Sequence, residues 1–263
     1  MDVATIVERC ERLYEDLDLE CVTRWKEAHP GGKAVGYLPT CVPREVLHAA
    51  GVLPVGVLGA GDQLDIVRGD AYFQSYMCHL PRSVVELGLS GRLNALDGMI
   101  FPSTCDVIRN LSGIWRLEFP EKYVRYLDLP QNFDPAVGGG FYAGILRELL
   151  ADMARLTGRA LEDCDLRASI RSYNENRRMV EALYELRANE PWRVPASEAY
   201  LLMRAGMVLD VEEHSALVRD YLTRIAKRED RARRARERIR KLSRTSAARI
   251  GRRTWSRDEL HER

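Results

Sequence analysis

Apolar and polar positions in the first 135 residues follow patterns that predict strands alternating with helices. Residues 3–28 have apolar side chains at helical spacing, which predicts one amphipathic helix that ends at residues 29–32, His-Pro-Gly-Gly. The apolar runs predict strands at 33–38, 52–58, 97–102 and 123–129. Helices are predicted between them at 44–50, around 71, after 81 and at 106–112. This alternation indicates parallel βαβ units, so we expect an α/β fold with a Rossmann-like, doubly wound sheet.

The pattern changes after residue 136. The remaining sequence predicts helices at 137–157, 161–189, 196–206 and 211–241, with no convincing strand between them. We therefore expect an α/β lobe with an N-terminal helix at 1–135, a helical region at 136–223 and a basic tail at 224–263.

Composition adds an asymmetry of charge to this picture. The 263 residues carry a net charge of +1, yet residues 224–263 hold 16 Lys and Arg against 6 Asp and Glu. The tail could bind a nucleic acid or another anionic surface. The alternative, which we favour, is a solvated or disordered end, since charge runs usually behave in that way. No apolar run reaches the roughly 20 residues of a membrane helix, and no signal sequence is visible, so we expect a cytoplasmic protein with no membrane partner.

Six cysteines in a reducing compartment are expected to be buried thiols or metal ligands rather than disulfides. Cys78 and Cys105 lie at predicted helix starts, where the helix dipole favours a thiolate. Two thiolates are too few for a closed site of four ligands, which leaves an open cluster, a third ligand elsewhere, or no metal. Cys41, Cys105 and residues 130–132 follow predicted strands and could line one crevice, with Cys41 as a third ligand. Three cysteines are interpreted as structural: Cys10, Cys21 and Cys164.

Four other side chains are candidates for chemistry. His79, next to Cys78, is the candidate for a catalytic, proton-transferring role. His48 lies on a short amphipathic helix, which favours a packed residue over a catalyst. Arg82 and Arg109 could contact an anionic substrate, although most arginines form surface pairs.

Several segments together resemble a known family. Residues 35–56 resemble the opening of the 2-hydroxyacyl-CoA dehydratase / benzoyl-CoA reductase family. Cys78 in Tyr-x-Cys-x-x-x-Arg-Ser and Cys105 in Pro-Ser-Thr-Cys-Asp match the family's first and second cluster cysteines. The resemblance runs in collinear order from about residue 30 to 220. The following segments look most like C-type subunits of ATP-dependent benzoyl-CoA reductases: 110–113, 129–132, 172–177 and 190–200.

The resemblance implies two Rossmann-like lobes around a [4Fe–4S] cluster held by three cysteines, with Cys78 and Cys105 as two of them. The open iron would face an aryl-CoA or acyl-CoA thioester. A homologous partner subunit and an ATP-hydrolysing activator would complete the system and supply electrons. The implied function is one-electron reduction of the aromatic ring of an aryl-CoA in anaerobic aromatic degradation. One alternative is a 2-hydroxyacyl-CoA dehydratase subunit, which expels water by a radical route. The other is a non-catalytic α/β scaffold with a nucleic-acid-binding tail.

The sequence departs from the family pattern beyond residue 240. Family members continue there into a second α/β lobe that carries the third cysteine ligand. Residues 241–255 are instead arginine-rich and contain no cysteine and no strand pattern. We therefore expect a truncated or out-of-frame end, with the second lobe missing, the third ligand not found and no nucleic-acid partner. Cys41 could replace that ligand only if its loop points into the same crevice.

Overall fold

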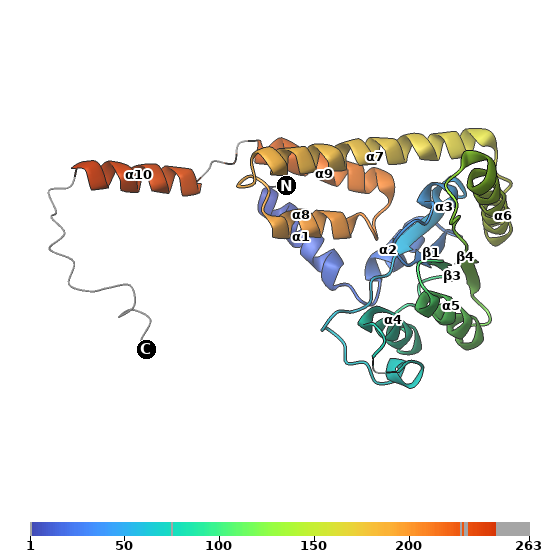
Figure 1. The fold of residues 1–263 in the computed structure, drawn as a ribbon. Helices are drawn as coiled ribbons and strands as arrows, with labels where there is room; N and C mark the ends of the chain where they lie inside the picture. The colour runs from blue at the N-terminus through green and yellow to red at the C-terminus, as the bar shows by residue number, and fades with distance from the viewer. Residues whose placement is uncertain (1, 75, 227, 229–230, 246–263) are drawn as a thin grey trace. The chain divides into compact units, whose positions relative to one another are not determined.

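The computed structural model describes residues 2–74, 76–226, 228 and 231–245 and divides into two compact units, Met1–Ala226 and Lys227–Arg263. The first unit contains a four-stranded, wholly parallel sheet in the order β2-β1-β3-β4 (Figure 1). Gly36 of the central strand pairs with Val55 on one side and Met99 on the other. The expected α/β fold with a parallel sheet and a following helical region is confirmed. The strands are β1 (Lys33–Tyr37), β2 (Val52–Gly56), β3 (Gly98–Pro102) and β4 (Tyr123–Leu127).

Helices cover both faces of the sheet and continue after it. In the first unit they are α1 (Val3–Glu15), α2 (Glu20–Ala28), α3 (Arg44–Ala49), η1 (Gly69–Ala71), α4 (His79–Leu89), α5 (Asp106–Glu118), the π-helical turn η2 (Pro135–Gly139), α6 (Gly140–Thr157), α7 (Asp163–Asn189), α8 (Ala196–Ala205) and α9 (Val211–Ile225). In the second unit the described residues form α10 (Arg231–Thr245).

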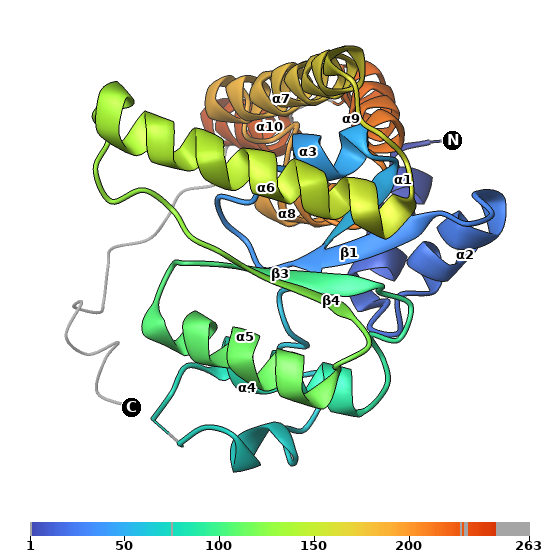
Figure 2. The ribbon, with the colours of Figure 1, turned by 90° about the vertical axis from the view of Figure 1, so that its right-hand side faces the viewer.

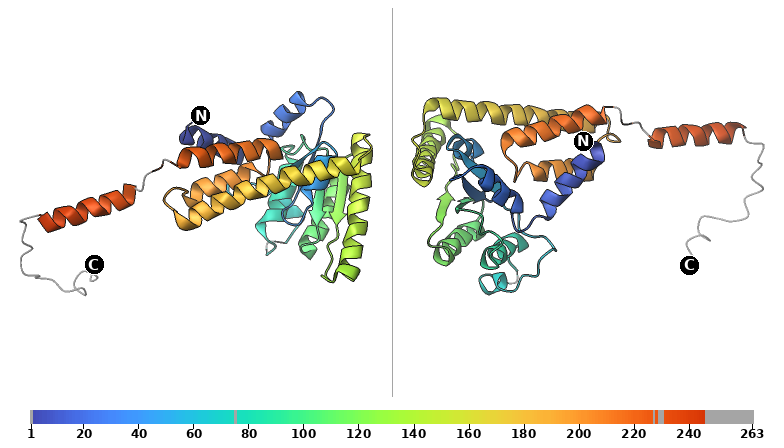
Figure 3. Two further views of the ribbon diagram at one scale, coloured as in Figure 1. Left: turned by 90° about the horizontal axis from the view of Figure 1, so that it is seen from above. Right: turned by 180° about the vertical axis from the view of Figure 1, so that it is seen from behind.

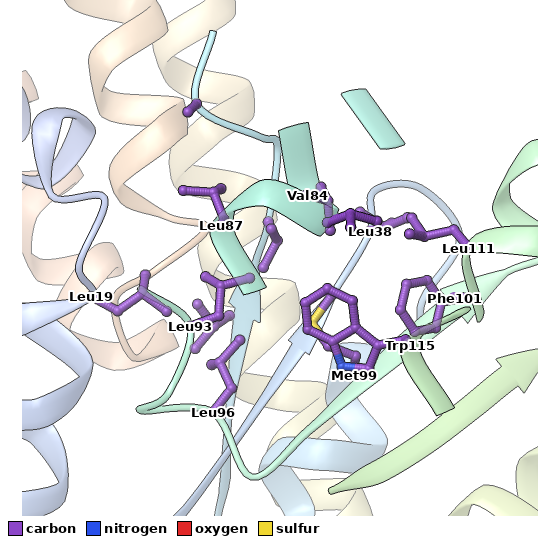
Figure 4. Packing of buried hydrophobic residues seen from close by; sticks show 14 of the residues in the cluster. Leu19, Leu38, Val84, Leu87, Leu93, Leu96, Met99, Phe101, Leu111 and Trp115 are labelled. Carbon is purple, nitrogen blue, oxygen red and sulfur yellow. The ribbon is translucent and has the colours of Figure 1, made fainter. Parts of the chain in front are cut away.

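The sheet divides two hydrophobic cores, because neighbouring strand residues point to opposite faces. Met99 and Phe101 of β3 join the core beneath α2, α4 and α5, whereas Ile100 joins the core beneath α3 and α6 (Figure 2). Trp115 of α5 is 2% exposed and packs against Phe101 with ring centroids 5.9 Å apart (Figure 4). This core fixes the position of α5 on the sheet.

A third hydrophobic core lies among helices alone. Ile6 and Cys10 of α1 pack with Leu202 of α8 and Tyr221 of α9, and α7 contributes Leu183. The 27-residue helix α7 (yellow to orange in Figure 3) extends from the sheet region to this helical layer. The N-terminal helix α1 therefore packs with the helical region. The three-part division by residue ranges stays a prediction.

The single helix predicted over residues 3–28 is wrong. The structure has α1 and α2 instead, with a break between them in which Leu19 has a left-handed φ of 54°. The Asp16 side chain accepts hydrogen bonds from the backbone N–H groups of Glu20 (2.9 Å) and Cys21 (2.8 Å). These bonds satisfy donors that a new helix leaves unpaired, so the chain begins a second helix there.

The continuous helix predicted over 211–241 is also interrupted. Helix α9 ends at Ile225 and α10 begins at Arg231. Part of the basic tail is thus helical, while residues 246–263 lie outside the described residues, so the expected disordered or out-of-frame end stays a prediction. Over the part of the chain that the structure describes, no helix is both long and apolar enough to cross a membrane.

Candidate functional site

The carboxyl edge of the sheet contains a topological switch point. The chain leaves β1 toward β2 on one side, and β3 then adds to the other side of β1. Loops that leave neighbouring parallel strands in opposite directions form the crevice where ligands of such folds bind. Cys41 follows β1, Cys105 follows β3 and residues 130–132 follow β4, so the three predicted segments do leave adjacent strands.

Cys105 is held close to the end of β3. It is the N-cap residue of α5, and its thiol is exposed. The backbone N–H of Ser103 donates to the carbonyl of Leu127 (2.9 Å), and the Ser103 hydroxyl accepts from the N–H of Leu129 (2.8 Å). Only one residue separates this tie from Cys105, so the thiol has little freedom to leave the sheet edge.

Cys78 occupies the equivalent position on the neighbouring helix. It is the N-cap residue of α4, its thiol is exposed, and α4 packs against α5 on the same face of the sheet (Figure 2). Neither Cys78 nor Cys105 caps its helix through a side-chain hydrogen bond. Both thiols therefore sit beside unpaired N–H groups and the positive end of a helix dipole, the setting that favours a thiolate.

A buried carboxylate fixes the long loop that precedes Cys78. Glu86 of α4 is 6% exposed, and its Oε2 accepts from the backbone N–H groups of Val67 (2.9 Å), Arg68 (2.6 Å) and Gly69 (2.9 Å). Burial alone would raise the pKa of Glu86, but these three donors hold it below its ordinary value. Glu86 is therefore a charged anchor between the loop and α4.

Two further contacts bind this loop to α4. Arg82 pairs with Asp70 (2.7 Å), so this candidate for substrate binding is occupied by a structural ion pair. Gly69 lies so close to α4 that a Cβ there would be 2.1 Å from the Arg82 carbonyl oxygen. Sequence reasoning missed Glu86; the available signal was one charged residue in the otherwise apolar run Val84-Val-Glu-Leu-Gly-Leu89.

Cys41 lines a different cavity, between the loop after β1 and helices α7 and α8. This cavity has a volume of about 680 Å³ and includes Tyr37, Arg44 and Arg204 in its wall, but neither Cys78 nor Cys105. Cys41 is exposed and has a left-handed φ of 62°. The structure therefore brings Cys41 to the same sheet edge without placing it in a shared cavity with the other two candidates.

The remaining cysteines differ in exposure. Burial raises the pKa of Cys10 to about 11 and that of Cys21 to about 12, which keeps both as neutral thiols. Cys164 is exposed at the start of α7.

The other candidate side chains are placed as follows. His79 is the first residue of α4 and is exposed beside Cys78. The guanidinium of Arg109 lies over the ring of Tyr126, 5.5 Å from its centroid, and remains exposed. His48 is half-buried and faces Asp210 and Glu212, so it is more than the packed residue that the sequence favours.

Known proteins resemble this chain over most of its length. A family model described as 2-hydroxyglutaryl-CoA dehydratase, D-component, matches residues 39–250. The chain is 56% identical over 227 residues to the C-type subunit of benzoyl-CoA reductase from Thauera aromatica, covering 86% of this chain and 59% of that protein. It is 30% identical to the beta subunit of (R)-2-hydroxyglutaryl-CoA dehydratase of Acidaminococcus fermentans, covering 70% and 49%. The beta subunit of lactoyl-CoA dehydratase of Anaerotignum propionicum is 29% identical, with 76% and 52% covered. The chain spans about half the length of the curated relatives it matches.

Proposed function

This chain belongs to the 2-hydroxyglutaryl-CoA dehydratase, D-component family, and we propose that it is a subunit of an ATP-dependent benzoyl-CoA reductase. Such an enzyme reduces the aromatic ring of an aryl-CoA thioester in one-electron steps. The observation that carries the proposal is the pair of exposed thiols, Cys78 and Cys105, at the starts of two packed helices. The 56% identity to a benzoyl-CoA reductase subunit supports the choice of reaction.

The donor set fits an iron–sulfur cluster, whose usual ligands are cysteine thiolates. Cys78 and Cys105 would hold the cluster, and the N–H groups at the starts of α4 and α5 would stabilise the negative charge of the bound thiolates. Of the six cysteines, Cys41 is the remaining exposed thiol at this sheet edge, but it lines a separate cavity. When bound, the cluster would supply electrons singly at low potential.

The protein's own residues would position the substrate and control protons. His79 adjoins Cys78, and its exposed imidazole would hold a proton for delivery on the substrate side. Arg109 remains exposed and is the better candidate for an anionic group of the thioester, since Arg82 is already paired with Asp70. The buried faces of α4 and α5 keep both thiols on one rigid layer of the fold.

Anaerobic reconstitution with iron and sulfide tests the cluster assignment. We expect the full chain to take up iron and to develop broad absorption at about 400 nm, the region of thiolate-to-iron charge transfer. Cys78→Ser and Cys105→Ser should each lower the iron content strongly. Cys164→Ser is the matched control, because Cys164 is also exposed at a helix start but lies elsewhere. Equal iron contents in all four proteins would refute the assignment.

The second candidate is a 2-hydroxyacyl-CoA dehydratase subunit, which the two relatives at 29% and 30% identity support. An anaerobic assay with the homologous partner subunit, the ATP-hydrolysing activator and both substrate classes separates the two. ATP-dependent reduction of benzoyl-CoA supports the reductase. Dehydration of a 2-hydroxyacyl-CoA without ring reduction would overturn it in favour of the dehydratase.

A further inference from the structure

A second group of potential metal ligands lies where α3 meets α9. It consists of His48 on α3, Asp210 at the N-cap of α9 and Glu212 in the first turn of α9. Within the described residues, this is the group in which three ligand atoms from His, Cys, Asp or Glu lie within 4.8 Å of one another. His48 Nε2 is 3.2 Å from Glu212 Oε2 and 4.0 Å from Asp210 Oδ2.

Hydrogen bonds to the rear of the ring fix the tautomer of His48. The hydroxyl of Ser169 is buried and donates its single proton to the backbone carbonyl of Glu45 (2.8 Å). The same oxygen lies 2.9 Å from His48 Nδ1, so it must accept, and Nδ1 must carry a proton. In the neutral ring, Nε2 therefore has a free lone pair, and that atom faces both carboxylates. This is the arrangement by which a second hydrogen bond orients a metal-ligating histidine.

The two carboxylates are positioned as well as the imidazole. Asp210 caps α9 by accepting from the N–H of Glu212 (3.0 Å) through Oδ1, which leaves Oδ2 directed to His48. Glu212 interacts with the hydroxyl of Ser172 and with the Asp210 carboxyl group. Two carboxylates and an imidazole lone pair at this separation repel one another unless a positive charge lies between them.

We propose that His48, Asp210 and Glu212 bind a divalent cation of the Mn²⁺ or Zn²⁺ class. Bonds of about 2.1 Å to nitrogen and oxygen would place ligand atoms about 3.4 Å apart in a tetrahedral site, close to the observed spacing. His48 and Asp210 also line a cavity of about 390 Å³, which provides room for water as a further ligand. The ion would connect α3, which packs on the sheet, to α9 of the helical layer. Its role would be structural and separate from the reaction at Cys78 and Cys105.

Titration of the chelator-treated full chain with Mn²⁺ tests this site, with the free ion followed by electron paramagnetic resonance. Mn²⁺ is a suitable probe because it prefers oxygen and nitrogen to thiolate ligands, so the six cysteines compete poorly. We expect one saturable site per chain. His48→Asn should abolish it, and Glu212→Gln should weaken it at least about tenfold, as loss of a ligand or its supporting partner does. Added Zn²⁺ should displace the bound Mn²⁺.

Glu213→Gln is the matched control. Glu213 is the next residue on α9 and pairs with Arg9, so the substitution removes the same charge from the same turn without touching the group. Glu212 has a side chain that is 56% exposed, so Glu212→Gln is expected to fold even if His48→Asn does not. Absence of a saturable site in the unmodified chain, or equal affinities in Glu212→Gln and Glu213→Gln, would overturn the proposal and leave an imidazolium–carboxylate ion group instead.

Discussion

The buried carboxylate of Glu86 gives the sharpest prediction for the loop that carries Cys78. Glu86→Gln preserves the size of the side chain but replaces a charged acceptor of three backbone N–H groups by a neutral amide. Hydrogen bonds to a charged group contribute roughly 1.5–3 kcal/mol each and neutral ones about 1 kcal/mol. The three bonds share one oxygen and the buried charge itself is costly, so we expect a net loss of about 1.5–3 kcal/mol in the free energy of unfolding.

Urea denaturation at neutral pH measures this loss, and a pH series identifies its cause. The folded-state pKa of Glu86 lies below its ordinary value, because the three donors outweigh burial. Its stabilising contribution is therefore complete above the unfolded-state pKa of roughly 4.3 and is lost as the pH falls through the lower, folded-state value. The stability difference between Glu86→Gln and the unmodified chain should shrink over the same range.

The control is Glu185→Gln, which removes an exposed carboxylate from α7. Surface substitutions of this kind change stability by about 0.5 kcal/mol or less. If Glu86→Gln cost no more than Glu185→Gln, or if its cost did not change with acidification, the interpretation of Glu86 as a charged anchor would be wrong.

Two other predictions concern thiol reactivity and packing. Alkylation at mildly alkaline pH, followed by mass spectrometry, should modify Cys10 and Cys21 last, because burial raises their pKa values to about 11 and about 12; prompt labelling of either would contradict their burial. The thiols expected to react first are Cys41, Cys78, Cys105 and Cys164. Gly69→Ala should destabilise the fold by about 2 kcal/mol or more, because the new Cβ would lie 2.1 Å from the Arg82 carbonyl oxygen. Gly113→Ala on α5, where a Cβ meets nothing within 4 Å, should instead stabilise by roughly 0.5–1 kcal/mol in the same urea experiment.

The sheet was predictable from the sequence because its strands are short apolar runs separated by helix signals. Each of the four predicted strands is present, and β3 is buried at all five positions. The break between α1 and α2 was not predictable from periodicity, since apolar residues keep helical spacing across it. It depends on a side-chain cap from Asp16 that forms only when the chain turns at Leu19.

The candidate site was predictable to different extents. Cys78 and Cys105 were placed at helix starts from local sequence, and both are N-cap residues. The group around His48 could not be found in this way, because 162 positions separate His48 from Asp210 and only the packing of α3 near α9 brings them together. Charge and spacing along the chain contain no signal for that contact.

The two helix-start thiols depend on different parts of the fold. Cys105 follows the end of β3 after two residues, so the buried sheet itself fixes its position. Cys78 follows the end of β2 after 21 residues, and only the contacts of that loop with α4, led by Glu86, can fix its backbone. Loss of these contacts would free Cys78 while leaving Cys105 in place. Any ligand that requires both thiols would then have to order the loop itself, at a cost in conformational entropy. The geometry of the pair is thus limited by the loop before α4 rather than by the sheet.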